Sequence, residues 1–146
     1  MYHDIKFLRQ NINNFIDTNG LMNNTNIAGI AARVLYLEGA NAIDTTRSLF
    51  SAYGMSLLDF VEFACELQAA SAFPIAAEAL WPVAAMRQQQ QFHDGEQWTG
   101  LGYAVLLRLF DGDVRVQSCS SEEDLQNLFT VDFVARRLRL LQMAQQ

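Results

Sequence analysis

Apolar residues recur at helical spacing along most of this chain, and residues that begin or end helices separate the runs. The first run predicts a helix over residues 4–17, closed by the Asn-Gly pair at 19–20, because glycine accepts the left-handed conformation that ends a helix. The second predicts a helix over residues 27–39, capped by one of the polar residues 24–26. The chain is therefore expected to be mainly α-helical.

The middle of the chain continues this pattern. Residues 44–54 predict a short helix that Asp44 caps and Gly54 ends. Ser56 and Asp59 then have the serine-to-acid spacing of a capping box, in which each side chain accepts a hydrogen bond from the other residue's backbone. A long apolar helix is predicted to follow, as far as about residue 72.

Two prolines punctuate the next stretch. Pro74 suits the first turn of a further helix, and Pro82 interrupts that helix because proline lacks an amide proton and clashes with the preceding turn. The glutamines at 88–91 can continue as a polar helical turn, and residues 93–96 predict a loop.

Residues 103–119 predict a β-hairpin. Two runs of branched and apolar residues flank Asp111 and Gly112, a pair that readily supplies the positive φ angles of a tight turn. Pairing across that turn would place five side chains on one apolar face: Val105, Leu107, Leu109, Val114 and Val116. A helix from Trp98 to Phe110 is the alternative, because the periodicity of a short apolar run does not distinguish a strand from a helix.

The C-terminal part predicts two helices. One starts at Ser120 or Ser121, where three acidic residues follow the cap, and the last starts at about Val131 with Val134, Leu138 and Leu141 inward. The predicted fold class is mainly α, a multi-helix bundle or helical array with one C-terminal hairpin followed by one or two helices. Residues 1–146 are expected to form a single domain.

Composition narrows the function classes. The net charge of −6 repels phosphate backbones and anionic lipid heads, so neither a nucleic-acid nor a membrane partner is expected. No apolar run approaches the roughly 20 residues of a membrane span. The N-terminus lacks a signal-peptide pattern, and the two cysteines lack the spacing of a zinc or redox motif, which together favour a cytoplasmic location.

The sequence offers little for catalysis. His3 and His93 are its only histidines, which restricts any mechanism that needs an imidazole base. It contains no nucleophile elbow, phosphate-binding loop or dinucleotide fingerprint, so we expect no catalytic residues, no cofactor and no metal site. One alternative function remains, a small enzyme or ligand-binding domain with a helical pocket near Trp81, His93 and Trp98.

Charged residues gather in two places. Asp59, Glu62 and Glu66 lie at helical spacing and predict an acidic face. The basic residues concentrate in the last helix, near its negative end, where complementing the helix dipole is the simplest role for them. This cluster and the second face of the hairpin supply the predicted partner-binding residues, which are Phe110, Arg115, Arg136, Arg137 and Arg139.

Residues 45–60 have the outline of a helix-turn-helix, with Gly54 between two predicted helices. A nucleic-acid regulator is therefore a second alternative. The second helix argues against it, because it would present Asp59, Glu62 and Glu66 to phosphate and carries no lysine or arginine to read a base.

Residues 57–90 resemble a tetratricopeptide helix pair. The resemblance lies in the spacing of large and small residues, namely Phe60, Phe63, Ala64 and Leu67, followed by Phe73, Ala76 and Leu80. In that family the small residues let the two helices pack closely, and arrays of such pairs bind peptides. The resemblance implies a peptide-binding role like that of small acidic cytoplasmic chaperones of bacterial secretion systems.

The function favoured by the sequence is a non-catalytic protein–protein interaction module of bacterial type, such as an adaptor, chaperone or inhibitor-type accessory protein. High apolar content, acidity and few histidines support this interpretation. The expected partner is another protein, which includes a second copy of this chain in a homodimer.

Overall fold

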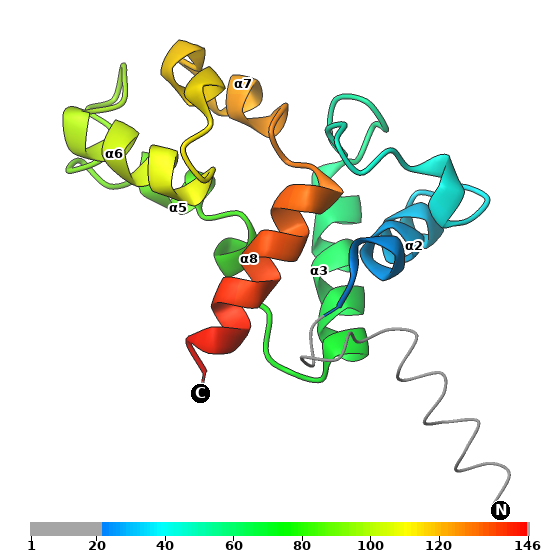
Figure 1. The fold of residues 1–146 in the computed structure, drawn as a ribbon. Coiled ribbons are helices and arrows are strands. Elements are labelled where there is room, and N and C mark those ends of the chain that lie inside the picture. Colours follow the sequence, from blue (N-terminus) through cyan, green and yellow to red (C-terminus); the bar gives the residue numbers. More distant parts are fainter. Residues whose placement is uncertain (1–21, 146) are drawn as a thin grey trace, which may run out of the picture.

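A computed structural model describes residues 22–145 of the chain (Figure 1). This part of the protein is mainly α-helical and forms no β-strand. Its elements are α2 (Asn24–Val34), η1 (Ala40–Ala42), α3 (Leu57–Ser71), α4 (Ala77–Leu80), α5 (Val83–Arg87), α6 (Gly100–Leu109), η2 (Val114–Ser118), α7 (Glu122–Gln126) and α8 (Val131–Met143). The helix predicted over residues 4–17 lies outside the described residues.

Side-chain caps begin most of these helices. The predicted capping box is confirmed: Ser56 Oγ accepts from Asp59 N at 3.0 Å, and Asp59 Oδ2 accepts from Ser56 N at 2.9 Å. Ser121 caps α7 as predicted. The cap of α2 is Asn23, one residue before the predicted candidates, and its Oδ1 accepts from Asn26 N at 2.8 Å.

Two predicted helices differ from the structure. The helix over 27–39 ends at Val34, because Tyr36 already adopts a positive φ of 59° and Leu37 N closes the turn by donating to Ala32 O at 2.8 Å. Residues 44–54 form turns, not a helix. There the Asp44 carboxylate accepts from Thr46 N at 2.9 Å, so it stabilises a turn of its own loop.

The region around the prolines is partly as predicted. Helix α4 ends at Leu80 and α5 begins at Val83, which confirms a break at Trp81 and Pro82. Pro74 begins no helix, since residues 72–76 are non-helical. The loop at 93–96 is confirmed, whereas residues 88–91 form turns beyond the end of α5.

The predicted hairpin at 103–119 is wrong. Its first half lies in α6, as the alternative prediction had it, and its second half forms η2. The buried residues Gly102, Leu106 and Phe110 recur every four positions, which is helical spacing. Asp111 and Gly112 do adopt positive φ angles, of 55° and 77°, but they end a helix instead of joining two strands.

The helices enclose one cluster of buried apolar residues, to which each of them contributes. Helix α2 packs against α3 and α8, and α4 packs against the same two helices. Figure 1 shows α2 and α6 on opposite sides of the molecule, with α3 and α8 between them. No helix among the described residues is both long and apolar enough to span a membrane.

The loop before α3 is tied to the turn before α8 by three hydrogen bonds. Leu49 N donates to Phe129 O at 2.9 Å, and Asp132 N donates to Thr45 O at 3.1 Å. Ser48, a buried serine, donates from its hydroxyl to Gln126 O at 2.6 Å. Segments about eighty positions apart in sequence are therefore joined side by side.

Candidate functional site

The three residues of the predicted helical pocket lie in two separate environments. Trp81 packs its ring against Phe110, Phe129 and other aromatic core residues. His93 instead stacks edge-to-face on Trp98 with ring centroids 4.9 Å apart, and its Nδ1 accepts from Gly95 N at 3.1 Å. The His93 ring is buried and engaged within its own loop, which leaves no site that combines it with Trp81.

The residues of the predicted acidic face have different partners in the structure, and the helix-turn-helix outline is incomplete. Asp59 is occupied by the capping box, and Glu66 pairs with Arg33 of α2 at 2.8 Å. Glu62 is exposed on α3. Residues 45–53 form turns, so the outline lacks its first helix. Within the described part of the chain, no group of three or more His, Cys, Asp or Glu side chains is arranged to hold a metal ion.

The predicted partner-binding residues have different environments. Phe110 is 2% exposed and belongs to the core. Arg115 pairs with Asp113 at 2.6 Å, and this hydrogen bond holds the pKa of the Asp113 carboxyl below its ordinary value. Arg136 pairs with Asp111 at 3.3 Å, and Arg139 is exposed on α8.

Arg137 differs from its neighbours because it points into the protein. Its Nε donates to Ala79 O of α4 at 2.7 Å, and burial lowers the pKa of the guanidinium. It lines a hollow of about 410 Å³ together with Pro82, Met86, Val105, Arg108, Leu109 and Leu140. The arginines lie in the middle of α8, with none in its last turn, so complementing the helix dipole is not their role.

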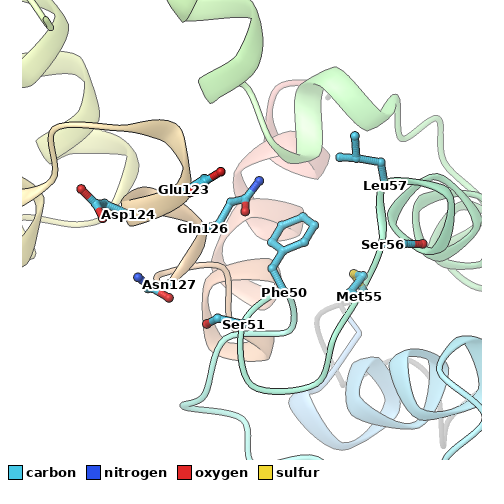
Figure 2. A pocket seen from close by; sticks show the side chains of 9 residues that line it. All are labelled: Phe50, Ser51, Met55, Ser56, Leu57, Glu123, Asp124, Gln126 and Asn127. Atoms are coloured by element: carbon cyan, nitrogen blue, oxygen red, sulfur yellow. The ribbon is translucent and has the colours of Figure 1, made fainter.

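A larger hollow opens between the start of α3 and α7 (Figure 2). Its volume is about 570 Å³. Phe50 stands between two walls, one from α7 and the residue after it and one from the chain that enters α3. The lining residues are Phe50, Ser51, Met55, Ser56, Leu57, Glu123, Asp124, Gln126 and Asn127.

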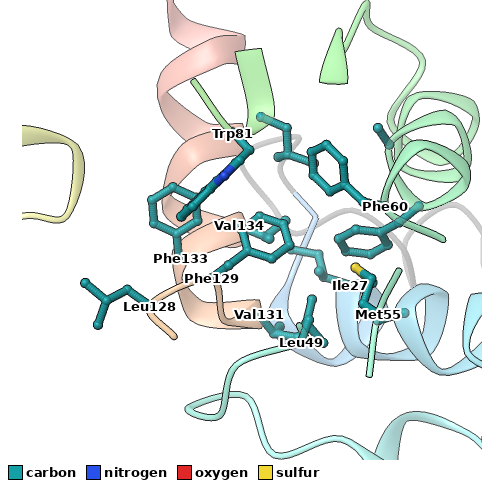
Figure 3. Packing of buried hydrophobic residues seen from close by; sticks show 14 of the residues in the cluster. Ile27, Leu49, Met55, Phe60, Trp81, Leu128, Phe129, Val131, Phe133 and Val134 are labelled. Carbon is teal, nitrogen blue, oxygen red and sulfur yellow. The ribbon is translucent and has the colours of Figure 1, made fainter. Parts of the chain in front are cut away.

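A second hollow, of about 160 Å³, adjoins the first and shares Phe50, Leu57 and Gln126 with it. Its other lining residues are Phe60, Ala77, Glu78, Trp81, Ala84, Ala85 and Glu122. We call the two hollows together the α3–α7 groove. Phe60 and Trp81 belong to the aromatic core drawn in Figure 3, so the groove floor is a face of that core.

Trp81 is the most deeply buried aromatic side chain that lines the groove, with 5% of its surface exposed. Its Nε1 has no hydrogen-bond partner among the described residues. A buried donor without a partner costs free energy, and most such donors in proteins are satisfied.

An apolar patch borders the groove on the first turns of α3. Leu57, Leu58 and Val61 have exposed fractions of 72%, 83% and 49%. Val61 lies four positions after Leu57 and three after Leu58, so it neighbours both of them on the helix surface, and Leu57 also lines the groove. We call these three residues the leucine patch. Contiguous apolar surface of this kind typically marks an interaction site.

The charges around the groove have one sign. Glu78, Glu122, Glu123 and Asp124 line it, and none of its lining residues is cationic. Asp124 is occupied in part, since its Oδ2 accepts from Ser120 N at 3.2 Å. Arg87 approaches Glu122 from outside the groove at 3.9 Å. The smaller hollow therefore has an apolar floor, the larger one is lined mainly by polar side chains, and both are bordered by acidic residues.

Comparisons with protein-family models, with curated proteins and with solved structures found no match for this chain. The geometry of residues 57–90 bears on the tetratricopeptide resemblance. Phe60, Phe63, Ala64 and Leu67 are buried on one side of α3, as in any amphipathic helix that packs on a core. The second helix is divided into α4 and α5, and Ala76 is exposed outside both.

Sequence reasoning did not locate the groove. Its lining comes from residues 50–60, 77–85 and 122–127, and no local pattern shows that these segments meet. One signal was available. Leu57 and Leu58 occupy adjacent positions in the first turn of α3, whereas its buried residues are Phe60, Phe63, Ala64 and Leu67. The stripe of Phe60 to Leu67 accounts for the core face, which leaves the two leucines outside it.

Proposed function

We propose that this protein is a non-catalytic protein-binding module and that the α3–α7 groove with the leucine patch is its docking surface. The observation that carries the proposal is the exposure of Leu57 and Leu58, at 72% and 83%, beside a hollow floored by aromatic core residues. Burying such side chains against a partner yields roughly 25 cal/mol per Å² of apolar surface. Docked apolar side chains would fill the hollow.

A panned library of displayed peptides tests this function. We expect the protein to enrich peptides with apolar anchor residues, because anchors that fill pockets contribute most of the binding energy in such interfaces. Leu58→Ser should weaken the enriched peptides about tenfold, which corresponds to about 1.4 kcal/mol. Binding is measured by fluorescence anisotropy with each labelled peptide.

Leu101→Ser is the matched control. Leu101 is also an exposed leucine, at 55%, and like Leu58 it is the second residue of its helix. Unlike Leu58, it is not part of the leucine patch, and it does not line the groove. The control should bind peptides as the unchanged protein does. Failure to enrich any peptide, or equal binding by Leu58→Ser and Leu101→Ser, would overturn the proposed function.

A further inference from the structure

The chemistry of the α3–α7 groove restricts what can occupy it. The smaller hollow has an apolar floor that includes Phe50, Phe60 and Trp81, so the part of the occupant that enters it must present apolar side chains. The rim carries Glu78 and Glu123, both exposed, and neither forms an ion pair in the described part of the chain. Unpaired carboxylates beside a low-dielectric floor favour a cationic partner and repel an anionic one.

The secondary structure around the groove restricts the occupant's backbone. Strand addition needs an exposed sheet edge, and the described residues form no strand. The walls are helices and loops, and the mode of recognition that suits such a surface is an amphipathic helix lying in an apolar groove. In that mode, side chains at positions i, i+3, i+4 and i+7 contact the floor and the flanking positions face the rim.

We infer that the α3–α7 groove binds a basic amphipathic helix of another protein, with apolar side chains on Phe50, Phe60 and Trp81 and with lysine or arginine side chains beside Glu78 and Glu123. This inference rests on the proposed function and gives the chemistry of the partner. The leucine patch extends the apolar contact along one side of the bound helix. Because the rim charges are exposed, they contribute orientation and association rate more than affinity.

Two synthetic peptides of about 18 residues, long enough to form a helix, test the inference. Both carry leucines at the same i, i+3, i+4 and i+7 positions, and their polar positions are all lysine in one and all glutamate in the other. We expect the lysine peptide to bind at least about tenfold more tightly. Its affinity should fall severalfold between 0.1 M and 1 M salt, where the Debye length shortens from about 10 Å to about 3 Å.

Rim variants test the position of the charges. Glu78→Gln combined with Glu123→Gln should weaken the lysine peptide about 3- to 10-fold, as expected for the loss of two exposed charge pairs. The matched control combines Glu38→Gln with Glu96→Gln, two exposed glutamates that do not line the groove. It changes the net charge by the same amount and should alter binding less than about twofold.

The outcomes separate the inference from the function on which it rests. Equal or tighter binding of the glutamate peptide, or equal effects of the two double variants, would overturn the inference that the partner is a basic helix. Enrichment of peptides from the library would still support a protein-binding module in that case. Self-association that the Glu78→Gln and Glu123→Gln variant abolishes, detected by sedimentation, would assign the groove to a second copy of the chain and also overturn it. A library that enriches nothing would remove the proposed function itself.

Discussion

At the scale of single residues, Gly102 shows how close packing decides the course of the chain. The first turn of α6 lies against the backbone of Phe92, whose carbonyl accepts from Thr99 N at 2.9 Å. A Cβ at position 102 would lie 2.1 Å from Phe92 O and 3.0 Å from its carbonyl carbon. Only glycine fits there, because both atoms belong to backbone that cannot rotate away.

We expect Gly102→Ala to destabilise the protein by about 1–3 kcal/mol, the usual cost of overpacking. Gly100→Ala is the matched control, since a Cβ at Gly100 meets nothing within 4 Å in the same helical turn. Alanine there should leave the free energy of unfolding unchanged or raise it by up to about 1 kcal/mol, through helix propensity. Urea unfolding followed by circular dichroism measures both, and equal stability of the two variants would contradict the packing described here.

At the scale of elements, what the sequence predicted correctly is encoded by neighbouring residues. Ser56 and Ser121 correctly predict the starts of α3 and α7, because an N-cap needs only a backbone amide two or three positions away. Pro82 correctly predicts a break between helices, because its missing amide proton and its ring affect only the preceding turn. The hairpin at 103–119 was wrongly predicted because positive φ at Asp111 and Gly112 serves a helix end as well as a tight turn.

Removal of the cap tests how much α3 depends on it. Ser56→Ala should lower the free energy of unfolding by about 1 kcal/mol, because Asp59 N loses its side-chain acceptor. Ser51→Ala is the control, an exposed serine in the preceding loop, and should change stability by less than about 0.5 kcal/mol. A shift in the urea midpoint for Ser56→Ala no larger than that of the control would show that the box does not stabilise α3.

The side chain of Arg137 connects two elements. It reaches from α8 to the carbonyl oxygen of Ala79 in α4, a helix of only four residues. Arg137→Met should cost about 1–2 kcal/mol, since a hydrogen bond from a charged donor is lost and a carbonyl is left without this partner. Arg139→Met, at an exposed position of the same helix, should cost less than about 0.5 kcal/mol. Thermal unfolding compares them, and a similar loss in both variants would contradict this role for Arg137.

At the scale of the whole molecule, one aromatic side chain contacts aromatic rings from several elements of the core. The ring of Phe129 lies 4.9 Å from that of Phe50, 5.3 Å from Trp81 and 5.6 Å from Phe60, measured between centroids. These partners come from segments up to about eighty positions away. Such contacts explain why the groove could not be read from the sequence, since periodicity identifies which residues are apolar but not which segments meet.

Phe129→Ala should lower the free energy of unfolding by about 3–5 kcal/mol, because a fully buried ring leaves a cavity. Phe129→Leu fills part of that cavity and should cost less, which keeps the comparison measurable if the alanine variant fails to fold. Leu140→Ala, at a residue 55% exposed, should change stability by less than about 0.5 kcal/mol. Guanidinium unfolding curves of the three variants test this order of stability losses. A Phe129→Ala variant as stable as Leu140→Ala would contradict it.

The hydrogen bonds between residues 45–49 and 126–132 join parts of the chain that are synthesised at different times. One wall of the α3–α7 groove is synthesised more than sixty residues before the other. A nascent chain that has not yet emerged past α7 therefore presents the leucine patch without the acidic wall opposite it. Docking through both walls, as proposed above, would therefore require a chain that is complete through α7, and a fragment cut between the walls would lack one of them.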